Sequence, residues 1–120
     1  MRLLPLLLSA CLMLMLAACG DSGGYTVQID PPKTMPKQVD VVTVNNPAGL
    51  ALIASVSSQR WFRDRDRIIA ARPDEISVEH FEIVPGTKQI VYTIDGSGVS
   101  GVYIFTNGET GTKRTEAARF

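Results

Sequence analysis

Few residues of this chain have the type and spacing that catalysis or metal binding requires. His80 is the only histidine, flanked by Glu79 and close to Glu82. A zinc site needs three or four convergent ligands, and no second imidazole or thiolate is placed to join it. Gly96–Gly101 is rich in glycine, but it has neither the lysine of a phosphate-binding loop nor the strand-to-helix turn of a nucleophile elbow. The pattern favours a partly exposed strand histidine and a flexible hairpin turn.

Carboxylate pairs are the remaining candidates for acid–base chemistry. Two such groups can hydrolyse a glycosidic bond when they flank it. Here Asp74-Glu75 and Glu79/Glu82 lie among polar strand and loop residues. We therefore predict that the protein is not an enzyme, and we infer no cofactor, metal ion or small-molecule substrate.

One cysteine does lie in a chemically informative context. Leu16-Ala17-Ala18-Cys19 closes an apolar run that starts at Leu3, after the single positive charge of Arg2. It resembles the lipobox of bacterial lipoproteins, which implies cleavage after residue 18 and lipidation of Cys19 by a diacylglycerol and an acyl chain such as palmitate. An ordinary secretory signal is the alternative. Leu8–Cys11 fits the same short pattern, but cleavage there would leave Leu12–Leu16 exposed.

The lipoprotein resemblance also implies a location. The apolar run is shorter than the roughly 20 residues of a spanning helix, whereas two or more lipid chains anchor a protein stably. Gly20 follows the cysteine, where enteric bacteria use aspartate to retain lipoproteins in the inner membrane, and Asp21 comes one place later. In a Gram-negative host we expect the outer membrane, facing the periplasm. Residues 19–24 would be the lipidated cysteine and a flexible tether.

Composition limits what the mature chain does. Removing residues 1–18 from 120 leaves 102 residues, the size of one small domain. Arg2 leaves with the signal, so 11 basic residues face 12 acidic ones and the net charge is near −1. This balance gives no basis for binding nucleic acid. Because Cys11 is removed and Cys19 is lipidated, no disulfide can form, and an apolar core must stabilise the fold.

The first half of the mature chain reads as strands and turns. Tyr25–Asp30 alternates apolar and polar residues, which is typical of a half-buried strand. Val39–Val44 is rich in β-branched residues and is also predicted to be a strand. Asn45–Gly49 contains strong turn formers. The continuous apolar run Leu50–Val56 then predicts a strand buried on both faces.

The second half begins with a change of period. Trp61, Phe62, Ile68 and Ile69 recur at a spacing of seven, which predicts a helix over Ser57–Arg72, with a charged edge strand as the alternative. Three further strands are then expected. They are Ile76–Val84, Lys88–Asp95 and Gly98–Thr106, the first two joined by the turn Pro85-Gly86.

These elements predict a mainly β fold. About six strands and one short inserted helix indicate a small β-sandwich of the immunoglobulin or transthyretin type, spanning residues 25–106. Residues 107–120 are polar and contain two glycines, so we expect a loose C-terminal tail.

Two features could bind a protein partner. Arg60–Arg63 includes Trp61 and Phe62, and tryptophan and arginine are enriched in interface hot spots. The alternative is that both aromatic side chains lie on the side of the helix that faces the protein core. The turn formed by Asn45, Asn46, Pro47 and Gly49 could present a recognition loop, or it could simply connect two elements.

The order of these segments resembles TssJ, the outer-membrane lipoprotein of type VI secretion systems. That family has a strand, an Asn-Pro turn with a nearby glycine, an apolar strand, a helical insertion containing phenylalanine, and three further strands. The matching segments are Val39–Val44, Asn46-Pro47 with Gly49, Leu50–Val56, the region of Phe62, Phe81–Gly86, Ile94-Asp95 and Gly101-Val102. The chain differs in a shorter insertion, in Ser55–Ser58, and in a compact first loop. In the family this loop contacts TssM, the inner-membrane partner.

Together these observations predict a lipid-anchored, periplasmic protein-binding module, which in the TssJ-like version tethers a trans-envelope secretion complex. A second class is a small lipoprotein inhibitor, immunity or exclusion protein that acts on a lytic enzyme or a surface receptor. A third is a sugar-binding module, although three tyrosines and one tryptophan offer few aromatic surfaces for sugars.

Overall fold

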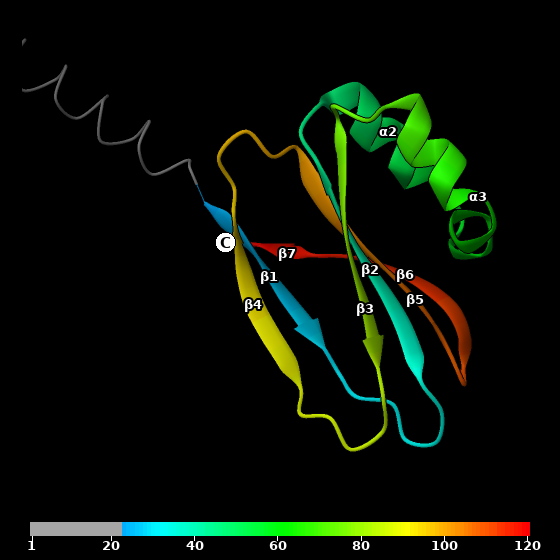
Figure 1. Ribbon diagram of the computed structural model, residues 1–120. Coiled ribbons are helices and arrows are strands. Elements are labelled where there is room, and N and C mark those ends of the chain that lie inside the picture. Colours follow the sequence, from blue (N-terminus) through cyan, green and yellow to red (C-terminus); the bar gives the residue numbers. More distant parts are fainter. Residues whose placement is uncertain (1–22) are drawn as a thin grey trace, which may run out of the picture.

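The computed structural model describes residues 23–120. The predicted signal peptide (1–18), the candidate lipidation site Cys19 and most of the tether (19–24) lie outside these residues. The described chain forms three layers (Figure 1): a three-stranded sheet, a four-stranded sheet, and a pair of helices on the outer face of the larger sheet. The predicted mainly β sandwich is therefore confirmed.

Residues 23–120 contain seven strands and two helices, where six strands and one helix were expected. In chain order they are β1 (Gly24–Ile29), β2 (Lys37–Val44), α2 (Pro47–Ser55), α3 (Ser58–Ala71), β3 (Ile76–Ile83), β4 (Ile90–Asp95), β5 (Gly101–Gly108), β6 (Gly111–Glu116) and β7 (Ala118–Arg119). The smaller sheet has the order β4-β1-β7 and the larger β3-β2-β5-β6, with every pair antiparallel.

The first core fills the space between the two sheets. Tyr25, Val27 and Ile29 point inward from β1, because alternate residues of a strand share one face. They meet Val39 and Val41 of β2. The alternating pattern that predicts a half-buried strand at Tyr25–Asp30 is confirmed.

The second core lies between the larger sheet and the helices. Val42 and Val44 of β2 face this side, where Ile53 of α2 and Trp61 of α3 cover them. The strand β2 is consequently buried on both faces, which explains its run of β-branched residues.

Leu50–Val56 is not a strand, and this prediction is wrong. It forms most of α2, which begins because the Asn46 side chain accepts a hydrogen bond of 2.8 Å from the Ala48 amide and Pro47 occupies the first helical turn. A continuous apolar run has no period of its own, so it suits a buried helix as well as a buried strand. The helical insertion is accordingly longer than predicted.

The helix predicted at Ser57–Arg72 is confirmed as α3, and the edge-strand alternative is wrong. Ser57 caps its start by accepting a hydrogen bond of 3.2 Å from the Arg60 amide. Arg72 ends it directly before Pro73, which cannot continue a helix. Trp61 and Ile68 are its buried residues.

The C-terminal segment is not a loose tail. The last predicted strand continues to Gly108, and Gly111, with a φ of 90°, lets the chain turn back as β6. The side chain of Ala117 is buried in the first core. Because β6 is an edge strand with exposed residues, its polar composition resembles that of a tail.

Candidate partner-binding surface

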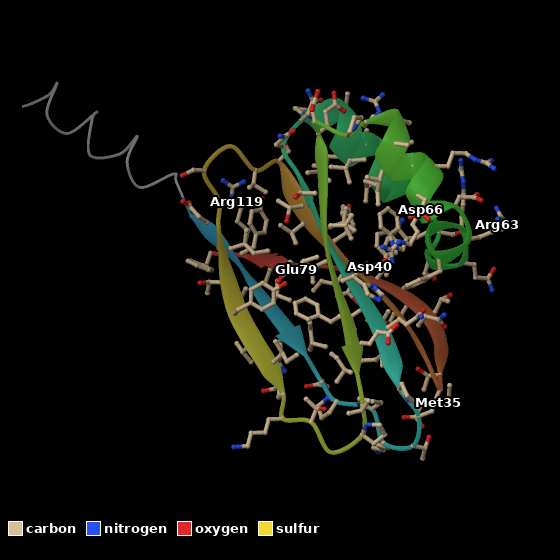
Figure 2. The ribbon with its side chains drawn as sticks, in the orientation of Figure 1. Met35, Asp40, Arg63, Asp66, Glu79 and Arg119 are labelled. Carbon is tan, nitrogen blue, oxygen red and sulfur yellow. The ribbon has the colours of Figure 1, made fainter. Side chains whose placement is uncertain are left out.

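Three loops meet at one end of the sandwich, which we call the tip: residues 30–36, 84–89 and 108–111. They connect β1 to β2, β3 to β4 and β5 to β6, and all three turns lie at the lower end of the molecule in Figure 1. The strand β1 starts at the opposite end and runs toward the tip. Figure 2 shows Met35 at the tip and Arg119, beside the start of β1, far from it.

Two carboxylates hold the three loops of the tip together. Glu109 accepts a hydrogen bond of 2.9 Å from the Lys33 amide and a second from the Thr34 hydroxyl. Asp30 accepts one of 2.5 Å from Nε2 of Gln89. The bond from Thr34 lowers the pKa of Glu109, and the bond from Gln89 lowers the pKa of Asp30, because both bonds favour the charged carboxylate. The loops are thus joined at neutral pH.

The tip exposes large apolar side chains. Met35 is 47% exposed and Val84 is 54% exposed, and they account for two of the four strongly exposed large hydrophobic side chains within residues 23–120. Pro36 and Val84 directly flank the paired residues Lys37 and Ile83, so the register brings the two loops together. Clustered exposed apolar side chains with polar neighbours are a feature of protein-interaction sites.

A shallow hollow of about 330 Å³ adjoins Met35. Glu82, Gln38 and Asn107, which pair in register across β3, β2 and β5, line it. The helices cover only the other end of this sheet face (Figure 1). The arrangement can offer amide and carboxylate groups to the backbone of a partner beside an apolar contact.

Trp61 is not available to a partner. Its side chain has no exposed surface, stacks on Phe105 with ring centroids 4.7 Å apart, and donates a hydrogen bond of 2.8 Å to Asp40. The prediction of a binding role for Trp61 is therefore wrong, and its core-facing alternative is correct. Phe62 is partly buried against the same core.

The candidate turn Asn45–Gly49 has structural tasks and does not lie at the tip. Asn45 donates a hydrogen bond of 2.9 Å to the Asp74 carbonyl, and Asn46 caps α2. Gly49 is buried, and a Cβ there would lie 3.0 Å from Val44. Pro47 is exposed. Of this group, Asn45 and Pro47 are exposed and Asn46 is partly exposed.

The structure also contains a polar cluster around one buried carboxylate, which we call the Asp40 cluster: Asp40, Trp61, Arg65 and His80. Asp40 is 0% exposed, yet its carboxylate accepts from Trp61 and from Arg65 at 3.0 Å, and lies 2.5 Å from Nδ1 of His80. Asp40 and His80 are register partners on β2 and β3. The signal in the sequence is a single aspartate inside the β-branched run Val39–Val44.

The Asp40 cluster also holds one partly exposed imidazole on β3. The His80 side chain is 34% exposed, as predicted for a partly exposed strand histidine, and its Nε2 lies 3.7 Å from Glu82. Residues 23–120 contain no group of three or more histidine, cysteine or acidic side chains arranged to hold a metal ion. The cluster connects β2, β3 and α3.

Comparison with protein-family models, with curated proteins and with solved structures finds no match to this chain. In the described part of the chain, no helix combines the length and apolar character needed to cross a membrane.

Proposed function

We propose that this protein is a lipid-anchored, periplasm-facing module that binds an envelope protein through its tip. The observation that carries the proposal is the placement of Met35 and Val84. These apolar side chains lie on joined loops at the end opposite the start of β1, where the chain arrives from Cys19. An anchored domain would present this end away from its membrane.

The tip has the physical properties that favour binding. Loops already held by Glu109 and Asp30 lose less conformational freedom when a partner orders them, so more of the interaction energy becomes affinity. Apolar side chains ringed by polar groups match the usual anatomy of an interface. Confinement to one membrane surface would further raise the effective concentration toward a partner in the envelope.

The resemblance to TssJ suggests what the partner is. The first loop of that family contacts the periplasmic domain of TssM, and residues 30–36, the corresponding loop here, form part of the tip. The strand at Val39–Val44, the helical segment around Phe62 and the strand before Pro85-Gly86 follow the order of the family, whereas the apolar strand that the family has after the Asn-Pro turn is the helix α2 here. We infer that a large inner-membrane subunit of a secretion complex is the partner, and that the anchor is in the outer membrane.

The test is affinity capture of the native protein from crosslinked envelopes. The Cys19→Ala variant removes the anchor, and Met35→Asp and Lys33→Glu alter the tip without touching either core. Gln59→Ala and Arg63→Ala serve as matched controls, because they change exposed side chains of α3, and Pro47→Ala tests the turn Asn45–Gly49 as the alternative binding surface. We expect the partner to be lost with the tip variants and with Cys19→Ala, and retained with both controls.

The captured protein separates the functional classes. An inner-membrane secretion subunit would support the TssJ-like function, whereas a lytic enzyme or a surface receptor would indicate the inhibitor, immunity or exclusion class. Loss of capture in Pro47→Ala together with full capture in Met35→Asp would overturn the placement of the binding surface at the tip.

A further inference from the structure

The two helices of the outer layer have different exposed faces. The exposed residues of α3 include Gln59, Arg60, Arg63 and Arg67, as expected of a surface helix. In contrast, α2 contains no charged residue, and its exposed residues are Pro47, Ala48, Ala51 and Ser55. One helix of the layer is suited to water, and the other presents an uncharged face of small, mostly apolar side chains.

A second apolar group lies at the same end of the molecule. The Phe120 side chain is 66% exposed, the largest value among the strongly exposed hydrophobic residues of the described chain. Its backbone is fixed to the start of β1, because the Gly24 amide donates to the Phe120 carbonyl at 3.1 Å and the Phe120 amide donates to the Gly24 carbonyl at 2.9 Å. Phe120 is therefore held where the chain enters the domain.

The loop at residues 96–100 connects these two groups. It runs from the end of β4, beside Gly24, to the start of β5, where the Ser100 amide donates to the Val44 carbonyl at 2.7 Å. There the Leu50 side chain of α2 lies directly on Gly101. Phe120, the loop and the exposed face of α2 together form what we call the rim. Figure 1 shows the loop and α2 at the end of the molecule opposite the tip.

Chain length limits how far the rim can lie from a lipid attached to Cys19. Only five residue steps separate Cys19 from Gly24, and a fully extended chain covers at most about 3.6 Å per residue. The start of β1 then stays within about 18 Å of the lipidated residue. This step rests on the lipid anchor of the proposed function.

We propose that the rim is a membrane-contact surface, with Phe120 and the exposed face of α2 resting in the headgroup region of the bilayer that holds the Cys19 lipid. Tethering makes weak apolar contacts sufficient, because the effective concentration of the bilayer at the rim is high. Asp95 and Asp74 are exposed at this end, which limits the contact to the interface. In this orientation the rim contacts the bilayer and the tip faces away from the membrane.

The test measures depth with tryptophan. Phe120→Trp and Ala51→Trp place an indole on the rim, and Met35→Trp places one on the tip as the matched control. The buried Trp61 contributes the same background to all three variants. Each lipidated protein is purified from envelopes and reconstituted into vesicles of phosphatidylethanolamine and phosphatidylglycerol containing brominated phosphatidylcholine. We expect the added emission of the two rim variants to be largely quenched and that of Met35→Trp to be retained.

The anchor is checked separately by the mass of the N-terminal peptide. A lipidated protein in which no rim variant is quenched, or in which Met35→Trp is quenched equally, would overturn the contact surface while leaving the proposed function intact. An unlipidated protein would overturn both, since the contact rests on the tether. Quenching of Phe120→Trp with retained emission of Ala51→Trp would exclude α2 from the proposed surface.

Discussion

Asp40 is a fully buried carboxylate, and its three partners explain how the fold tolerates it. Trp61 and Arg65 donate to it, and the imidazole of His80 lies at hydrogen-bonding distance. A buried charge is costly unless it is paired and hydrogen-bonded. Once it is paired, removing one partner lowers the free energy of unfolding by more than the pair contributes on balance, because the other charge is left buried and unpaired.

We predict that Asp40→Ala strongly destabilises the domain. The substitution leaves the Trp61 indole without an acceptor and Arg65 without its buried partner, which we expect to lower the free energy of unfolding by about 3 kcal/mol. Urea denaturation measures the change. The control is Asp66→Ala, because Asp66 also lies near Arg65, at 3.7 Å, but is 97% exposed; there we expect a change within about 0.5 kcal/mol. An equal loss of unfolding free energy in the two variants would contradict the stabilising role of the Asp40 cluster.

Tyr92 provides a prediction about alkaline pH. Burial, and then the charge of Glu79, raises the pKa of Tyr92 from 10.0 to about 12. The folded protein therefore keeps a proton that the unfolded chain releases, so the stability from this group is complete below pH 10 and is lost as the pH rises toward 12. We expect Tyr92→Phe to show a smaller fall in the free energy of unfolding across this range, measured by denaturant titration at each pH.

The same substitution should be tolerated at neutral pH. The Tyr92 hydroxyl is buried without a hydrogen-bond partner among residues 23–120, so removing it sacrifices no observed bond. A variant that is clearly less stable at neutral pH, or one that retains the full alkaline loss, would contradict this assignment.

At the scale of elements, α2 depends on a strand that follows it by more than fifty residues. Arg114 of β6 donates to the carbonyls of Ala54 and Val56, at 2.6 and 2.9 Å, and its guanidinium lies over the Tyr103 ring. The last carbonyls of a helix have no partner within it and carry partial negative charge. The Arg114 guanidinium therefore caps the C-terminal end of α2.

We predict that Arg114→Ala loosens α2. The loss of two charge-assisted bonds to carbonyls should lower the free energy of unfolding by about 1 to 2 kcal/mol. Lys113→Ala is the matched control, since Lys113 lies next to it on β6 and points to the opposite face. Thermal and urea denaturation compare the two variants. A Lys113 variant as unstable as the Arg114 variant would refute the specific role of the arginine.

At the scale of the whole molecule, β2 is the centre of the structure. It pairs with β3 and β5 along almost its full length, and both of its faces are covered. The tip, in contrast, consists of loops outside the two sheets. Local openings need less free energy where few apolar contacts must separate.

Hydrogen exchange should reflect this arrangement. We expect the amides of Val39–Val44 to exchange most slowly, at the rate of global unfolding, and the amides of residues 30–36 to exchange faster than these, with the Lys33 amide protected by its bond to Glu109. Mass spectrometry or NMR provides the rates. Slowest exchange in β1 instead would place the stability centre in the smaller sheet.

The elements with local signals can be predicted from the sequence alone. The alternation at Tyr25–Asp30 and the seven-residue spacing of Trp61 and Ile68 set a strand and a helix, because periods of 2 and 3.6 are visible without knowing any neighbour. Together with the strands expected at Val39–Val44 and over residues 76–106, these patterns predict the mainly β sandwich with one inserted helix, and α2 was not predicted.

The remaining features depend on packing and pairing between segments that are distant in the chain. Leu50–Val56 has no period, so its cap at Asn46 and its packing on the larger sheet made it a helix. Residues 111–116 are polar and resemble a tail in the sequence, and they form a strand only by pairing with β5. An edge strand that is exposed to water does not need an apolar pattern. The candidate site follows the same logic: Trp61 is apolar enough for a core or an interface, and the tip unites loops far apart in the chain. Which side chains stay exposed depends on what covers them, and that is a property of the packed molecule.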